Sequence, residues 1–185
     1  MAAATFWQST MWTRFAKPAC DQSLYQRVQR CHPTRIVEFG IGDLVRAQRA
    51  ISLAQRYAAK SDDSAEATRI QYCGIDMFDM RADQSPLSLK EAHNRLAKTG
   101  AKVRLVPGDL SSALARTANI LQNTDLLIVD ATYSRDQLES VYHFLPRMLH
   151  ADTSIARYSF YNGKLRLRWM KPDSFVTPVR RRRAA

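Results

Sequence analysis

Four short apolar segments alternate with stretches of helical periodicity, and this alternation constrains the fold more than any other feature of the 185-residue chain. We expect strands at 35–39, 69–75, 102–106 and 126–129. The predicted helices lie at 21–31, 44–60, 85–99, 111–121 and from 134 to about 145. This order implies right-handed crossovers, a mostly parallel sheet and helices on both faces of that sheet. We therefore predict an α/β fold, a three-layer sandwich around a Rossmann-like sheet.

The C-terminal part departs from this alternation. Two strand-like segments, 153–161 and 164–170, are joined by Asn162-Gly163, a dipeptide that favours a two-residue hairpin turn. We therefore expect an antiparallel hairpin strand at the end of the sheet. This divides the chain into an N-terminal arm (1–20), the Rossmann-like domain (21–171) and a basic, flexible tail (172–185).

The positive charge of the chain is concentrated at its C-terminal end. Of the net charge of +11, the segment from Arg157 onward supplies +8, through nine basic residues and one acidic residue. Nucleic acid is therefore expected as a partner only through this end, by phosphate contacts, and the run Arg180–Arg183 is otherwise a solvated tail. No apolar run approaches the roughly 18 residues of a membrane-spanning helix, so no membrane partner is expected.

The three cysteines of the chain lack CxxC spacing, which argues against a disulfide framework and against a structural zinc site. They are Cys20, Cys31 and Cys73. Reduced thiols are typical of a cytoplasmic protein, which is the localisation that we expect.

An acidic residue stands at or just after the end of each predicted parallel strand. These residues are Glu38, Asp76, Asp109 and Asp130. In open α/β sheets ligands bind outside the carboxyl ends of the strands, so the four acids mark the expected ligand site. Each of them could alternatively cap the helix that follows it.

The loop after the first strand contains two glycines that would let a ligand approach the backbone closely, Gly40 and Gly42. The acid beside them suits an ammonium group and would repel a pyrophosphate. The dinucleotide fingerprint wants a third Gly or Ala, and here that position is Val45, so the loop does not favour a dinucleotide. An acid at the end of the second strand suits the hydroxyls of a ribose.

At these residues the chain resembles the class I S-adenosylmethionine-dependent methyltransferases, over about 35–148. The segment Glu38-Phe-Gly-Ile-Gly42 is similar to their acid-x-Gly-x-Gly motif, and Gly74-Ile-Asp76 to the acidic end of their second strand. Gly108-Asp109-Leu110 is similar to the segment that meets the adenine. Among these enzymes, the chain is most similar to the small bacterial sugar and antibiotic O-methyltransferases.

The resemblance implies S-adenosylmethionine as the cofactor. Glu38, Gly40 and Gly42 would line its methionine part, whereas Asp76 would bind the ribose. Asp109 and Leu110 would flank the adenine. Asp130 would lie near the transferred methyl group, and it is our candidate catalytic residue, as a general base or as a group that positions the acceptor.

Two departures from the family pattern leave three hypotheses open. Leu44 stands where a third glycine often stands, and the segment Asp130-Ala-Thr-Tyr-Ser134 lacks the usual metal ligands, so no metal is expected. The first hypothesis is a methyltransferase that acts on a small-molecule acceptor. The second is a non-catalytic protein of the same fold that binds the cofactor or has lost it. The third is a nucleic-acid-binding adaptor with a basic tail.

Overall fold

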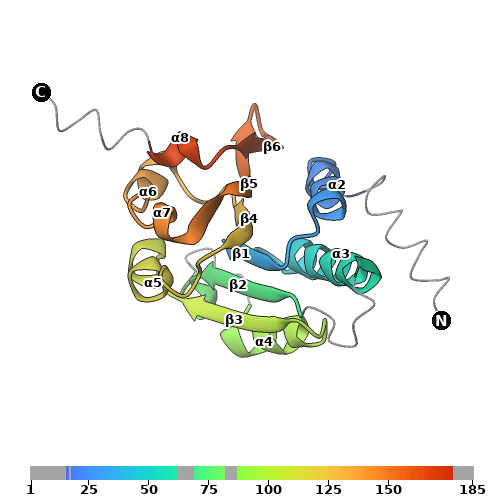
Figure 1. Cartoon of the computed structure of the whole chain (residues 1–185). Coiled ribbons are helices and arrows are strands. Elements are labelled where there is room, and N and C mark those ends of the chain that lie inside the picture. The colour runs from blue at the N-terminus through green and yellow to red at the C-terminus, as the bar shows by residue number, and fades with distance from the viewer. Residues whose placement is uncertain (1–15, 17, 62–68, 82–86, 177–185) are drawn as a thin grey trace, which may run out of the picture.

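The six strands of the protein form one sheet in the order β3-β2-β1-β4-β5-β6 (Figure 1). The computed structural model describes residues 16, 18–61, 69–81 and 87–176. The strands are β1 (Arg35–Phe39), β2 (Gln71–Asp76), β3 (Lys102–Pro107), β4 (Thr124–Val129), β5 (Leu149–Tyr161) and β6 (Lys164–Met170). Strands β1 to β5 pair in parallel and β6 pairs antiparallel with β5. The predicted mostly parallel sheet with a C-terminal hairpin is confirmed.

Helices cover both faces of this sheet and complete the predicted three layers (Figure 1). They are α2 (Asp21–Cys31), α3 (Val45–Ser61), α4 (Leu89–Ala97), α5 (Leu110–Thr117), α6 (Arg135–Glu139), α7 (Leu145–Met148) and α8 (Asp173–Val176), with one 3-10 turn, η1 (Phe78–Met80). Residues of α2, α3 and α4 share one apolar cluster with the sheet, and residues of α5, α6 and α7 share the other.

The strand register brings the ends of three parallel strands to one edge of the sheet. The Gly40 N–H donates to the Ile75 carbonyl at 2.9 Å, and the Asp130 N–H donates to the Phe39 carbonyl at 2.8 Å. The loops after β1, β2 and β4 therefore leave the sheet side by side. This is the edge at which the sequence places its ligand site.

Helix α4 begins later than predicted. The expected start at 85 and 86 lies outside the described residues, and α4 itself begins at Leu89. The Ser88 hydroxyl accepts the Glu91 N–H at 3.1 Å, so Ser88 is the residue that caps this helix. After this helix, Gly100 adopts a left-handed backbone, with φ +82°.

The helix predicted from Ser134 to about Leu145 is interrupted. Its capping box between Ser134 and Gln137 is confirmed, but α6 ends at Glu139 and turns follow until α7. Pro146 lies in the first turn of α7. Between the two helices the N–H groups of Val141, Tyr142, Phe144 and Leu145 donate to carbonyls three residues earlier, so this stretch consists of tighter turns and not of α-helix. The prediction of one continuous helix was wrong.

The predicted arm and tail fall largely on residues that the structure does not describe. Ala16 is buried in the core, and residues 173–176 of the predicted tail form α8. The run Arg180–Arg183 lies outside the described residues. None of the helices that the structure describes is both long and apolar enough to cross a membrane.

Candidate functional site

Two adjoining cavities lie at the carboxyl ends of the parallel strands. The larger, of about 410 Å³, is lined by Gly40, Gly42, Asp76, Met77, Arg81, Asp130, Thr132, Tyr133 and Gln137. The smaller, of about 160 Å³, is lined by Asp109 and Leu110 and shares three lining residues with the larger. Six of the seven residues predicted for the site therefore line these cavities. The seventh, Glu38, is fully buried and lines neither.

The Asp76 carboxylate accepts four hydrogen bonds from the chain itself. The backbone N–H groups of Ile41 and Phe78 donate at 2.8 and 3.0 Å. Arg81 adds a bidentate pair, with Nε at 2.7 Å from Oδ1 and Nη2 at 2.8 Å from Oδ2. Burial alone would raise the pKa of Asp76, but these hydrogen bonds, led by that from Arg81, lower it. The carboxylate is therefore ionised and held at the cavity wall.

Arg81 also contacts the loop that contains Gly40 and Gly42. Its Nη2 donates to the Gly42 carbonyl at 3.0 Å. The Arg81 guanidinium thus engages both Asp76 oxygens and the glycine loop together, so any further donor to Asp76 would compete with Arg81.

Arg46, on the first turn of α3, bridges two of the predicted acids. Its Nε lies 2.7 Å from Glu38 Oε1, and its Nη2 lies 2.8 Å from Asp130 Oδ2 and 3.0 Å from the Gly40 carbonyl. The Tyr72 hydroxyl donates to the other Glu38 oxygen at 2.7 Å. Burial raises the pKa of Glu38, whereas Arg46 and Tyr72 oppose that shift. Glu38 is thus a buried partner of Arg46 beneath the cavity floor.

Asp130 lies at the cavity wall with both carboxylate oxygens engaged. Oδ1 accepts the Thr132 N–H at 3.0 Å and Oδ2 pairs with Arg46, while the side chain remains 17% exposed. The carboxylate is therefore held in one orientation, with one edge open to the cavity.

The Asp109 carboxylate caps α5, which is the alternative role considered for the strand-end acids. Its Oδ1 accepts the Ser112 N–H at 3.0 Å. This contact lowers the pKa of Asp109, which is exposed. Asp109 still borders the smaller cavity, beside Leu110.

Tyr133 separates and lines both cavities. Burial, followed by the charges of Asp76 and Asp130, raises its pKa, so the hydroxyl is protonated at neutral pH. Its hydroxyl forms no hydrogen bond with another described residue, and no buried side-chain oxygen in this part of the chain lacks a partner. The hydroxyl is therefore accessible, and it belongs to a side chain that lines both cavities.

The two glycines of the loop have different physical roles. A Cβ added to Gly40, where φ is +78°, would lie 2.7 Å from Asp130 Cβ, so this position is a glycine because the loop after β4 packs on it. A Cβ at Gly42 would meet nothing within 4 Å, so this glycine leaves open space beside the cavity. Leu44 also has a positive φ of +72° and is fully buried.

The sequence interpretation missed both arginines and the full role of Tyr133. Tyr133 lies three residues after Asp130, and this proximity to the strand end is a usable signal. Nothing in the sequence selects Arg46 or Arg81 from the other arginines of the chain, because tertiary packing determines their partners. Within the described residues, no three His, Cys, Asp or Glu side chains are grouped so that they could hold a metal ion.

Comparison with known proteins finds likeness in structure and none in sequence. No family model and no curated protein matches the chain. Among solved structures, CmcI in a form with Mg and SAM is 16% identical, with a TM-score of 0.51 over 78% of this chain and 54% of CmcI. The O-methyltransferase TomG from Streptomyces achromogenes, in complex with SAM, is 14% identical, with a TM-score of 0.48 over 84% of this chain and 65% of TomG.

A third similar structure is a Plasmodium falciparum protein, described as a putative protein-L-isoaspartate O-methyltransferase in complex with S-adenosyl-L-homocysteine. It is 12% identical, with a TM-score of 0.49 over 81% of this chain and 66% of the other. The chain thus spans only about half to two thirds of the lengths of these proteins. The likeness to CmcI, together with the sheet order described above, shows that the chain has the class I, Rossmann-like methyltransferase fold.

Proposed function

We propose that the protein binds S-adenosylmethionine at the carboxyl end of the sheet and transfers its methyl group to a small-molecule acceptor. One observation carries the proposal: Gly40, Gly42, Asp76 and Asp130 line a single cavity of about 410 Å³ in a methyltransferase fold. The cavity is large enough for a ligand of cofactor size when the adjoining space beside Leu110 is included.

Asp76 would hold the ribose of the cofactor. The Ile41 and Phe78 N–H groups fix the orientation of the carboxylate, with one donor at each oxygen. Arg81 has to release Asp76 first, because its guanidinium occupies the same oxygens. Leu110 offers an apolar wall for the adenine, and the open side of Gly42 admits the cofactor to the loop backbone.

Asp130 and Tyr133 would position the acceptor. S-adenosylmethionine, when bound, supplies a methyl group on a positively charged sulfur, and an acceptor nucleophile can take that group. Alignment of the acceptor with that methyl contributes more to such a transfer than strong acid or base assistance. The open edge of the Asp130 carboxylate can accept a hydrogen bond from the acceptor. The Tyr133 hydroxyl, from the same loop, can donate one.

Isothermal calorimetry with S-adenosylmethionine and S-adenosylhomocysteine tests the cofactor assignment. We expect Asp76→Ala to weaken binding by about 1–3 kcal/mol, the scale of a lost charged hydrogen bond. We expect Arg81→Ala to strengthen it, by about fivefold or more, because the competing internal ion pair is removed. Absence of heat with wild type and with Arg81→Ala would contradict the proposal.

A non-catalytic protein of the same fold is the second candidate function. The favouring observation is that Arg46 and Arg81 already satisfy the three acids that the cofactor would contact or approach. A screen of small hydroxyl, amine and carboxylate acceptors, read by release of S-adenosylhomocysteine, separates the two candidates. Binding without release for any acceptor, in wild type and in Arg81→Ala, would favour the non-catalytic candidate.

A further inference from the structure

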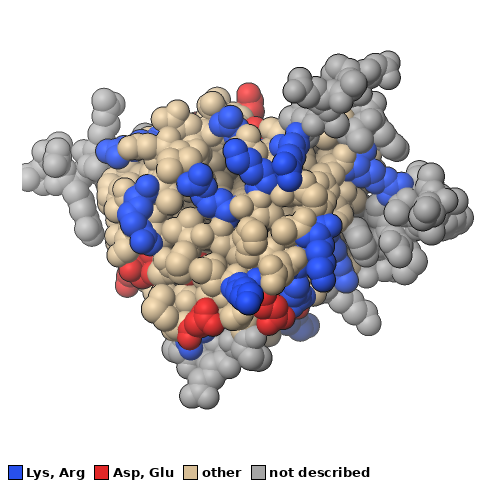
Figure 2. All heavy atoms as spheres, turned by 90° about the horizontal axis from the view of Figure 1, so that it is seen from below, with Lys and Arg blue, Asp and Glu red and all other residues tan. Residues whose placement is uncertain are grey.

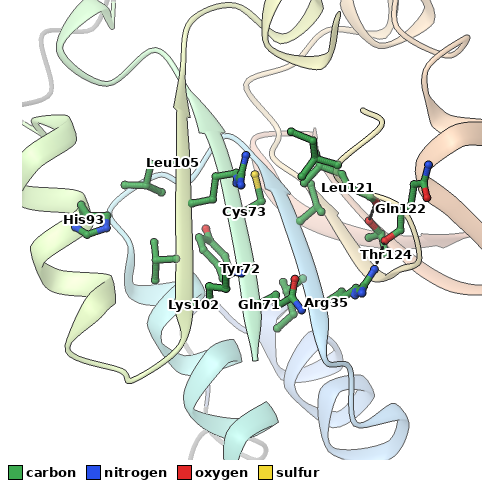
Figure 3. Close-up of a pocket in the computed structure, with 15 residues that line it drawn as sticks. Arg35, Gln71, Tyr72, Cys73, His93, Lys102, Leu105, Leu121, Gln122 and Thr124 are labelled. Carbon is green, nitrogen blue, oxygen red and sulfur yellow. Dashed lines mark hydrogen bonds between the residues drawn. The ribbon is translucent and has the colours of Figure 1, made fainter. Parts of the chain in front are cut away.

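A second cavity, of about 400 Å³, lies at the opposite end of the strands (Figure 3). The first residues of β1, β2 and β3, which are Arg35, Gln71 and Lys102, are register partners and all line it. Figure 3 shows these three side chains at one level of the sheet. Thr124, the first residue of β4, also lines the cavity. This cavity shares no lining residue with the two at the carboxyl ends.

The cavity exists because α5 is too short to cover its face of the sheet. Its eight residues span about 12 Å, whereas six-residue strands such as β2 and β3 span about 20 Å. Leu110 and Leu114 of α5 share an apolar cluster with Ile75 and Val106, near the carboxyl ends of the strands. The chain then turns after Thr117, and the cavity lies over the amino halves of the strands, beside the turn that contains Ile120 and Leu121.

The floor of this cavity is apolar and its rim is basic. Val37, Cys73 and Leu121 are buried, and Ile120 beside them is 56% exposed, which is unusual for a large apolar side chain. Burial raises the pKa of the Cys73 thiol to about 12, so it is neutral and unreactive at physiological pH. The floor therefore suits a hydrocarbon or aromatic group held without a covalent bond.

Three cationic side chains line the cavity, and no Asp or Glu is among the described residues that do so. Arg35 donates to the Gln122 carbonyl at 2.7 Å. Lys102 and Arg104 form no ion pair and no side-chain hydrogen bond with another described residue. They are two residues apart on β3 and thus lie on one face of it, about 7 Å apart along the strand. Figure 2 shows more Lys and Arg than Asp and Glu on the side of the molecule where β3 lies.

We propose that this cavity binds a small amphipathic anion, whose apolar body rests on Val37, Cys73 and Leu121 while its carboxylate, sulfonate or phosphate pairs with Lys102 and Arg104. An apolar floor with a few convergent polar groups is the usual construction of a small-molecule site. Two cations on the same face, neither of them paired with a described residue, supply the charge that an anionic group requires. The proposal is independent of the cofactor site.

The probe is anilinonaphthalene sulfonate, added to the full chain and followed by fluorescence and by calorimetry. We expect saturable binding with one site per chain. Lys102→Ala/Arg104→Ala should weaken it by about tenfold or more, since two charge-assisted contacts are lost. Gln71→Trp keeps both cations but fills the cavity mouth, and it should abolish binding of the probe. Neutral phenylnaphthylamine should bind wild type at least about tenfold more weakly than the sulfonate.

The matched control is Lys164→Ala/Arg166→Ala, which removes a Lys and an Arg two residues apart on another exposed strand, β6. It should leave the affinity within about twofold, and unfolding curves of all variants verify that the native state is being measured. Equal losses in the two double variants, equal affinity for the neutral analogue, or no saturable binding would overturn the proposal. Lys102 and Arg104 would then be charges that protect an edge strand from aggregation.

Discussion

The charged side chains at the two ends of the parallel strands differ in whether they have a partner of opposite charge. At the carboxyl end Glu38, Asp76 and Asp130 each lie within 2.8 Å of an arginine nitrogen. At the amino end Lys102 and Arg104 have no carboxylate partner among the described residues. The acids lie in the interior or at a cavity wall, where an unpaired charge is costly, whereas the two cations are exposed and hydrated.

This difference shows that topology alone does not make a ligand site. Parallel strands bring their terminal acids together, and the mutual repulsion and desolvation of those acids must be offset within the folded chain. Here Arg46 and Arg81 provide that offset. The same two side chains therefore stabilise the folded site and compete with any ligand that would use its acids.

The largest expected effect is that of removing Arg46. Arg46→Met leaves Glu38 fully buried without its cation and should lower the free energy of unfolding by about 3–5 kcal/mol. Lys102→Met, the same loss of charge at the amino end, should change it by no more than about 0.5 kcal/mol. Urea unfolding of both variants measures the contrast. Equal destabilisation would refute the difference between the ends, and Arg46→Met/Glu38→Gln should regain much of the loss.

A smaller effect is expected from crowding the glycine loop. Gly40→Ala places a Cβ 2.7 Å from Asp130 Cβ at a positive φ, and should cost about 2–4 kcal/mol. Gly42→Ala has the positive φ without the contact, and should cost about 1 kcal/mol. Thermal unfolding separates the two. If both variants lose the same stability, packing by the loop after β4 is not what requires Gly40.

The stability due to Asp76 should depend on pH. Since its pKa in the folded protein is below the ordinary 3.8, its stabilisation is present above that value and is lost as the pH falls through the folded pKa. Asp76→Asn should therefore be less stable than wild type by about 1–3 kcal/mol at neutral pH. The gap should close in strong acid. A gap that persists unchanged in acid would show that the charge of Asp76 is not the stabilising feature.

The smallest expected effect concerns the basic C-terminal end of the chain. If a single-stranded oligonucleotide binds there, truncation after Met170 should abolish binding, while Lys102→Ala/Arg104→Ala should leave it unchanged. Each lost phosphate contact should reduce the log–log salt slope by about 0.7. Fluorescence anisotropy at several salt concentrations measures it. Binding that depends on Lys102 and Arg104 would instead show that the oligonucleotide contacts the cavity at the amino ends of the strands.

The strands and the acids at their ends were predictable because short apolar runs in this alternation leave few alternative topologies. The hairpin at Asn162-Gly163 was predictable from its turn chemistry. Helix boundaries were less so: Ser88 and Glu91 have the spacing of a helix start, but the nearby Ser85-Pro86 offers a competing one. The helix predicted from Ser134 ends early, at Glu139, although the residues that follow keep a helical pattern of apolar positions.

The position of the candidate site was predictable, whereas the ion pairs between its side chains were not. Strand order places Gly40, Asp76 and Asp130 together, and the structure brings them to one cavity. The choice of Arg46 as the partner of Glu38 depends on how α3 lies across β1, which no local pattern encodes. The same holds for the amino-end cavity, because it depends on the length of α5 relative to the strands beneath it.

The left-handed backbone of Leu44 ties the glycine loop to the hydrophobic interior. A left-handed leucine costs about 1–2 kcal/mol, and burial of its side chain contributes about 1.5–3 kcal/mol in return. Glycine there would relax the backbone and leave a hole under α3, whereas asparagine would tolerate the backbone and bury an amide. The wall of the cavity and the packing beneath α3 can therefore change during evolution only together, as one unit of sequence.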